Sequence, residues 1–189
     1  MEQAAVEAEL SQCLSEEGSK LQQCLEAMKQ AGCKVGPDYF KVMTCGALRA
    51  VGGYSQQQGV ILCHDQLQTP SQVASTALHE LLHAYDDCRA GAGGLDWADC
   101  QAHACAEVRA AALSGDCDLQ QEIWRGKVEV TRPSTWFDVH AKCVARRATL
   151  SVQLNPNCQE EGVAAKAVAD VIARCMADKA PFVQPSPSE

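Results

Sequence analysis

The sequence contains no CxxC pair, no long uncharged apolar run and no excess of basic residues. The first absence argues against a zinc ribbon or a thioredoxin-type redox motif. The second argues against a membrane-spanning helix, which needs about 20 apolar residues. The chain has 16 Lys and Arg against 24 Asp and Glu, a net charge of −8. That balance argues against nucleic-acid binding, which requires a basic face.

Cysteine, in contrast, is abundant, with 12 residues in a chain of 189. The even number and the spread from Cys13 to Cys175 favour structural disulfides formed in an oxidising compartment. Small buried thiols in a reduced protein are the alternative. The acidic residues 1–18 resemble neither a basic secretory signal nor an Arg-rich mitochondrial presequence. We therefore expect an oxidised protein that reaches its compartment without a cleaved signal.

Local signals predict mainly helices. Residues 2–31 should be helical, and β-like pieces at 39–45 and 59–63 should be joined by a flexible GGYSQQQG segment. The clearest helix should begin at Thr69, where Pro70 takes the first position and Gln72 completes a capping box, and it should end at Gly91. Further helices are expected at 97–113 (capped by Asp96), 119–125, 138–154 and 160–178, with a strand or loop at 127–136.

The segment His79-Glu80-Leu81-Leu82-His83 carries the chemistry. Residues four apart lie on one face of a helix, so both imidazoles can bind one zinc ion at about 2.0–2.1 Å. Glu80 lies beside them, where it can take a proton from the attacking water. The pattern therefore predicts a metallopeptidase centre with Zn²⁺ as its cofactor.

A catalytic zinc needs a third protein ligand. His103 and Glu107 share one face of a later helix, and Glu107 lies 24 residues after His83, so we favour Glu107 as the ligand. His103 is then a neighbour or a proton donor to the transition state, and the reverse assignment stays open. Asp86, an alternative ligand, is more suited to orienting an imidazole. Asp87 is expected to be solvated.

A strand before an HExxH helix is typical of zincins, in which an edge strand pairs with an extended substrate. We therefore predict an α+β, mainly helical, zincin-like fold with a small β-sheet before the HExxH helix and disulfide staples. The expected organisation is an N-terminal helical, cysteine-containing segment (1–36), a metalloprotease domain (37–180) and a disordered tail (181–189).

Longer motifs then identify a resemblance. HELLHAYDDCR (79–89), DW (96–97) and HACAEVRAAALSGDC (103–117) are jointly far more specific than HExxH. With CVARRATLSV (143–152) and AVADVIARCMADKAPF (167–182), they resemble the mitochondrial inner-membrane metalloprotease family that processes and helps assemble a membrane subunit of ATP synthase. The resemblance extends over about residues 20–182. The GAGG loop is slightly longer than is usual between the two motifs.

The resemblance implies that His79 and His83 bind zinc and that Glu80 is the catalytic base of peptide hydrolysis. It implies a precursor of the membrane-sector subunit as the peptide substrate and the oxidative-folding import machinery as a partner. It also implies a location at the mitochondrial inner membrane, on the intermembrane-space side. Because the sequence has no membrane-spanning run, we expect membrane contact to be peripheral, and the acidic net charge predicts no nucleic-acid partner.

Three alternatives stay open at this point. An assembly chaperone for the synthase membrane sector would tolerate the loss of proteolysis. A structural disulfide protein would bind no stoichiometric metal. A reduced, chromatin-associated HExxH protease is a third alternative, which the net charge of −8 disfavours.

Overall fold

The computed structural model describes residues 1–36, 38–48, 50–128 and 138–182. The chain divides into two compact units: Met1–Gly94 together with the described residues from Lys179 onward, and Leu95–Asp178. The compact units divide the chain after Gly94. The predicted domain boundary between residues 36 and 37 stays a prediction. Most of the predicted strand or loop at 127–136, and of the tail at 181–189, lies outside the described residues.

The first unit combines helices with a small sheet. Its helices are α1 (Gln3–Ser15), α2 (Lys20–Gln30) and α3 (Pro70–Arg89), and its strands are β1 (Phe40–Met43), β2 (Gly52–Ser55) and β3 (Gly59–Cys63). The helical region predicted at 2–31 is interrupted, because Glu16 is extended and ends the first helix at Ser15, and Gly18, with a φ of +74°, lies in the turn that follows. Ser19 then caps α2 by accepting a hydrogen bond from the Gln22 amide at 3.2 Å.

The sheet has the strand order β1-β3-β2, with β1 parallel and β2 antiparallel to β3. The predicted strands at 39–45 and 59–63 are confirmed as β1 and β3. The prediction of a flexible connection at 52–59 is wrong for its first half, because residues 52–55 form β2. Two adjacent glycines suggested a loop, whereas here the first of them, Gly52, allows the strand to lie very close to its neighbours.

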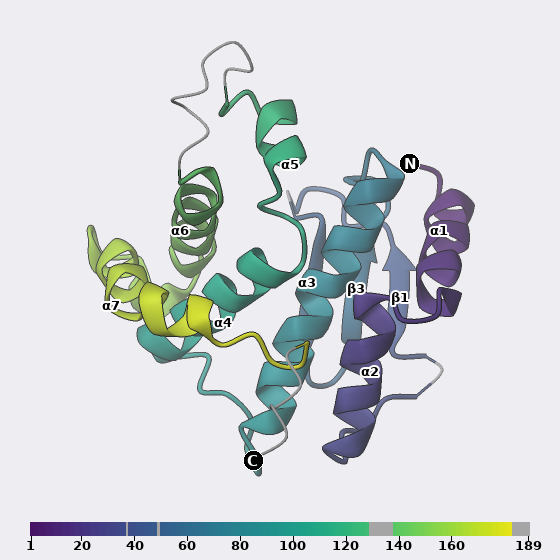
Figure 1. Cartoon of the computed structure of the whole chain (residues 1–189), viewed down its shortest axis with the longest axis horizontal. Coiled ribbons are helices and arrows are strands. Elements are labelled where there is room, and N and C mark those ends of the chain that lie inside the picture. The colour runs from purple at the N-terminus through teal and green to yellow at the C-terminus, as the bar shows by residue number, and fades with distance from the viewer. Residues whose placement is uncertain (37, 49, 129–137, 183–189) are drawn as a thin grey trace, which may run out of the picture. The chain divides into compact units, whose positions relative to one another are not determined.

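Helix α3 packs on one face of the sheet and also contacts α1 and α2 (Figure 1). Val42 and Gly52 both lie opposite Leu62 in the strand register, so these three residues share a face. Gly52 abuts the side chain of Thr76 on α3, which identifies this face as the one that α3 covers. The buried apolar side chains of the unit include Val6, Leu10, Leu21, Met28, Val60, Leu62, Val73, Ala77 and Leu81.

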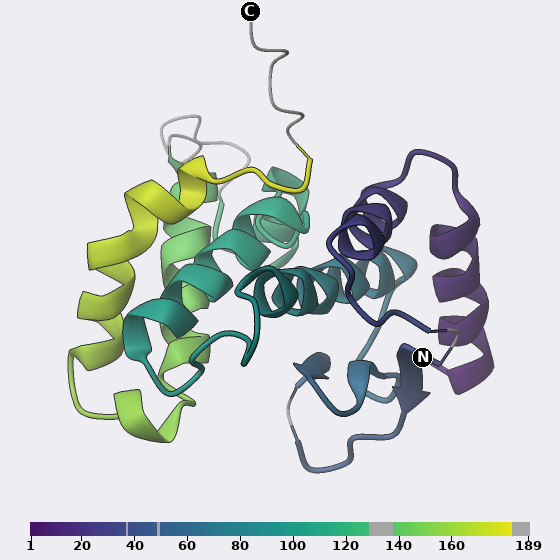
Figure 2. The same cartoon turned by 90° about the horizontal axis from the view of Figure 1, so that it is seen from below.

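The second unit is helical in its described residues. It contains α4 (Cys100–Leu113), α5 (Leu119–Trp124), α6 (Val139–Val152), a 3₁₀ turn (Pro156–Cys158) and α7 (Val163–Ala177). Helices α4, α6 and α7 pack side by side (Figure 2). Their shared core is built from small and β-branched residues, among them Ala104, Val108, Val144, Ala148, Val168 and Val171.

The structure contains five disulfides, which confirms the disulfide prediction. Each bond lies within one unit: Cys33–Cys88 and Cys45–Cys63 in the first, and Cys100–Cys158, Cys105–Cys175 and Cys117–Cys143 in the second. Cys13 retains its thiol. Cross-links that close long loops stabilise a fold by restricting the unfolded chain, so both units gain stability beyond that of their small cores.

Candidate active site

Helix α3 begins as its sequence predicts. The Thr69 hydroxyl accepts a hydrogen bond from the Gln72 amide at 3.3 Å, and Pro70 occupies the first helical position. The Gln72 side chain departs from the expected capping box, because it accepts from the amide of Gln68 at 2.8 Å. The helix then continues unbroken to Arg89, so the HExxH segment lies on a rigid element.

His79 and His83 lie one turn apart on α3. Their ring centroids are 4.8 Å apart and the rings are nearly perpendicular, at 81°. His83 is buried, with 5% of its surface exposed, and His79 is half-buried. Two neutral imidazoles at this separation can direct one nitrogen each to a single ion. The donor set therefore fits a transition metal such as zinc.

Glu80 is buried and lies directly against β2. A β-carbon added to Gly52 would lie 3.3 Å from Cγ of Glu80 and 2.8 Å from the carbonyl oxygen of Ile61. Only glycine therefore fits at this position of the strand. Sequence reasoning missed Gly52, although glycine within a strand is itself a sign of close backbone approach.

Replacing Gly52 by alanine should lower the free energy of unfolding by about 1–3 kcal/mol, because the new methyl group overpacks the space between β2 and α3. Gly53→Ala is the matched control, since nothing lies within 4 Å of the position its β-carbon would take. Urea denaturation of both variants measures the difference. Equal stability of the two variants would contradict the close packing at Gly52.

Asp87 links helix α3 to β2 and to the turn that follows it. Its carboxylate is buried and accepts hydrogen bonds from the Tyr54 hydroxyl at 2.8 Å and from Nε2 of Gln56 at 3.1 Å. The pKa of Tyr54 is raised mainly because the hydroxyl is buried, and further because it donates to this carboxylate. The expectation that Asp87 is solvated is therefore wrong. Asp86, also buried, forms an ion pair with Arg89 at 2.9 Å.

In the second unit, His103 and Glu107 lie together on α4. Nε2 of His103 is 3.4 Å from Oε1 of Glu107. The buried Glu107 carboxylate also accepts a hydrogen bond from the Ser151 hydroxyl at 2.6 Å. The Asn155 side chain donates to Nδ1 of His103 at 3.2 Å and to the Trp97 carbonyl at 2.7 Å. Sequence reasoning found the first pair but missed Ser151 and Asn155.

The cap of α4 differs from the predicted one. Asp99, not Asp96, accepts the hydrogen bond from the Ala102 amide at 2.7 Å. Asp96 instead stabilises the preceding turn by accepting from the Ala98 amide at 3.0 Å. Both residues have the short acceptor side chain that a cap needs, so composition alone did not distinguish them. The predicted end of this helix at residue 113 is confirmed, with Ser114 as the C-cap.

The ligand set predicted from the sequence is divided between the units. His79, Glu80 and His83 belong to the first unit, and His103 and Glu107 belong to the second. The assignment of Glu107 as the third ligand therefore stays a prediction from spacing. The histidines outside the motifs have local partners, with His64 hydrogen-bonded to Thr44 at 2.9 Å.

Among the described residues, no helix combines the length and the apolar composition required to cross a bilayer.

Comparison with known proteins gives a consistent result. The model of the peptidase M76 family matches residues 5–183. The chain is 34% identical to the mitochondrial inner membrane protease atp23 of Schizosaccharomyces pombe over 156 residues, which is 82% of this chain and 80% of the relative. It is 40% identical to the mitochondrial inner membrane protease ATP23 of Saccharomyces cerevisiae over 134 residues, 69% of this chain and 56% of the relative.

The Yarrowia lipolytica protein of the same name is 36% identical over 132 residues, 69% of this chain and 49% of the relative. The chain thus spans only about half the length of these last two relatives. No solved structure matches it. Because the family model covers nearly the whole chain and the S. pombe protein aligns over most of both lengths, the chain belongs to the peptidase M76 family.

Proposed function

We propose that the protein is a zinc metalloendopeptidase that removes the N-terminal segment of a mitochondrially encoded membrane subunit of ATP synthase and assists its assembly. The observation that carries the proposal is the arrangement on α3, where two adjacent imidazoles flank a buried glutamate that contacts an edge strand. The names of the relatives, mitochondrial inner membrane proteases, support a location at that membrane, and we propose that its attachment there is peripheral. The intermembrane-space side would suit its five disulfides.

In this proposal His79, His83 and Glu107 hold the ion. When bound, zinc lowers the pKa of its water from 15.7 to about 7 and polarises the scissile carbonyl. The Ser151 hydroxyl, which donates to Glu107 at 2.6 Å, would orient that carboxylate. His103, held by Asn155, would stabilise the charge that develops on the carbonyl oxygen.

Glu80 is the general base of the proposed reaction. It accepts a proton from the attacking water and returns it to the leaving amine. The Glu80 side chain is buried between α3 and β2, which restricts its rotation. A carboxylate held in one place can take part in proton transfer without first losing rotational freedom.

The outer edge of β2 is the proposed contact for the substrate backbone. The Cys63 amide donates to the Val51 carbonyl at 3.0 Å, and hydrogen-bonded pairs alternate along antiparallel strands. Gly53 therefore directs its backbone groups to β3, whereas those of Gly52 and Tyr54 point to the opposite edge. An extended peptide that paired there would pass directly beside Glu80.

Metal content tests the proposal directly. We expect oxidised wild-type protein to contain about one zinc per chain by mass spectrometry, and His83→Ala to contain none, because the variant loses a ligand. His64→Ala is the matched control, since His64 bonds to Thr44 outside the motif. Circular dichroism checks that each variant is folded. Unchanged zinc in folded His83→Ala would contradict ligation by this residue.

A further inference from the structure

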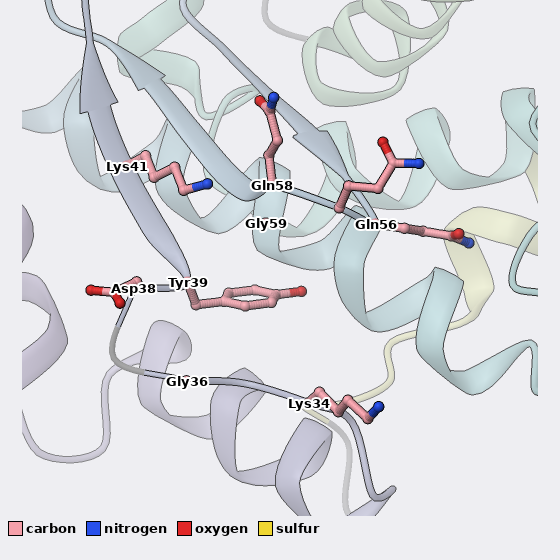
Figure 3. A pocket seen from close by; sticks show the side chains of 9 residues that line it. Lys34, Gly36, Asp38, Tyr39, Lys41, Gln56, Gln58 and Gly59 are labelled. Atoms are coloured by element: carbon pink, nitrogen blue, oxygen red, sulfur yellow. The ribbon is translucent and has the colours of Figure 1, made fainter.

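The two units hold polar side chains in different surroundings. In the first unit, a pocket of about 320 Å³ is bordered by exposed side chains, among them Lys41, Gln56 and Gln58 (Figure 3). The second unit instead holds a group of mostly buried side chains around His103, in which Asn155 is only 8% exposed. Buried polar groups are held by their hydrogen-bond partners. The partners in this group therefore reveal which atoms donate and which accept.

The orientation of the Asn155 amide is fixed by two backbone groups. Its Nδ2 donates to the carbonyl of Trp97 at 2.7 Å, and its Oδ1 accepts from the amide of Asn157 at 3.1 Å. A carbonyl can only accept and a backbone amide can only donate, so the nitrogen and the oxygen of the side chain cannot be exchanged. The second hydrogen of Nδ2 is therefore available to Nδ1 of His103, which lies 3.2 Å away.

This arrangement determines which ring nitrogen of His103 carries the proton. Nδ1 must be the acceptor, because otherwise two N–H groups would face each other. In the neutral ring the proton then lies on Nε2. Nε2 is 3.4 Å from Oε1 of Glu107, so a donor faces the carboxylate there. His140 has the opposite arrangement, since its Nδ1 lies 3.2 Å from the carbonyl of Cys117 and must donate.

A cross-link holds Asn155 opposite His103. The Cys100–Cys158 disulfide joins the first residue of α4 to the 3₁₀ turn that Asn155 caps. His103 follows the first cysteine by three residues, and Asn155 precedes the second by three. The Trp97 ring lies at 75° to the imidazole, with the ring centroids 5.6 Å apart. The amide and the imidazole are therefore both held in place, as a pair with a positioning role requires.

We propose that Asn155 is a positioning residue that keeps the His103 proton on Nε2, the nitrogen that faces Glu107. The inference rests on the proposed function, in which His103 stabilises the charge that develops on the carbonyl oxygen. Only a protonated Nε2 can donate to that oxygen, whereas a lone pair at this position would repel it. Asn155 touches no reacting atom and acts only through His103. All of these residues belong to the second unit.

NMR of the ring nitrogens in histidine-labelled protein tests the assignment without requiring catalysis. At about pH 9, where imidazole is neutral, His103 in the wild type should have a protonated Nε2 and an unprotonated Nδ1. His140 should show the reverse. The signals of the two rings are identified by their loss in His103→Gln and His140→Gln.

Variants of Asn155 should change the His103 spectrum in a defined way. Asn155→Asp should move the proton to Nδ1, because a carboxylate can only accept. Asn155→Ala, which removes the donor without adding charge, should give a mixture of both tautomers. Asn157→Asp is the matched control, since it adds the same charge at an exposed position two residues away. It should leave the proton on Nε2.

Kinetics separates this role from a merely structural one. Asn155→Ala should lower kcat for peptide hydrolysis by about 10–100-fold, the usual effect of losing an outer partner, with KM and zinc content close to those of the wild type. In a His103→Gln background the same change should have no further effect, because Asn155 acts through His103.

Three results would overturn the proposal. They are a proton on Nδ1 of His103 in the wild type, an Nε2 proton that persists in folded Asn155→Asp, and an equal further loss of kcat in the His103→Gln background. Absence of hydrolysis by zinc-loaded wild type, with the NMR pattern as expected, would count against the peptidase function and leave the tautomer assignment standing.

Discussion

Glu80→Gln protein should lose peptide hydrolysis by about 10²–10⁴-fold, the usual contribution of general acid–base catalysis. Glutamine has nearly the same shape as glutamate and fits the same buried position beside Gly52. It cannot accept a proton from water at neutral pH, so the loss should be in kcat. Zinc content and thermal stability should remain close to those of the wild type.

The control for this prediction is Glu26→Gln, an equivalent change at an exposed glutamate on α2, which should leave kcat unchanged. Retained hydrolysis in the Glu80 variant would remove Glu80 from the mechanism. The same variant separates proteolysis from assembly in cells. If it restores synthase assembly while the precursor accumulates uncleaved, the assembly role does not depend on hydrolysis.

Removing the Cys105–Cys175 disulfide should have the largest effect on stability. The bond joins α4 to α7 across 70 residues, the longest separation among the five disulfides. The chain-entropy model gives a loss of about 4 kcal/mol for a loop of this length. Cys105→Ala/Cys175→Ala protein should therefore unfold at a much lower urea concentration than the wild type.

Two further variants make this measurement specific. Cys13→Ser changes a cysteine that retains its thiol and should leave the free energy of unfolding within about 0.5 kcal/mol of the wild type. Cys45→Ala/Cys63→Ala opens a loop of only 18 residues and should cost about 3 kcal/mol. A larger loss of unfolding free energy in Cys45→Ala/Cys63→Ala than in Cys105→Ala/Cys175→Ala would contradict the loop-length argument.

Helix α3 was predictable because its signals are local. Thr69 and Pro70 mark its start within two residues, and His79 and His83 repeat at the helical period. Such features need no knowledge of the rest of the chain. The same holds for the end of α4 at Ser114, which precedes a glycine with a φ of +87°.

The contacts that complete the candidate site were not predictable because they are distant in sequence. Ser151 bonds to Glu107 across 44 residues, and Asn155 bonds to His103 across 52. Strand β2 was missed for a related reason. Glycine is disfavoured in strands, and here the pairing of Gly52 and Gly53 with β3, together with the close approach of Gly52 to α3, accounts for the strand. The disulfide partners are likewise set by the fold, since 12 cysteines allow too many pairings to choose from spacing.

The arrangement of the disulfides along the chain has a consequence for biogenesis. Both bridges of the first unit are complete by Cys88, and the bridges of the second begin only at Cys100. A chain threaded through a membrane pore from its N-terminus can therefore lock its leading half while the trailing half is still in transit. The cross-linked residues 33–88 would then prevent the chain from sliding back through the pore before the second unit has folded.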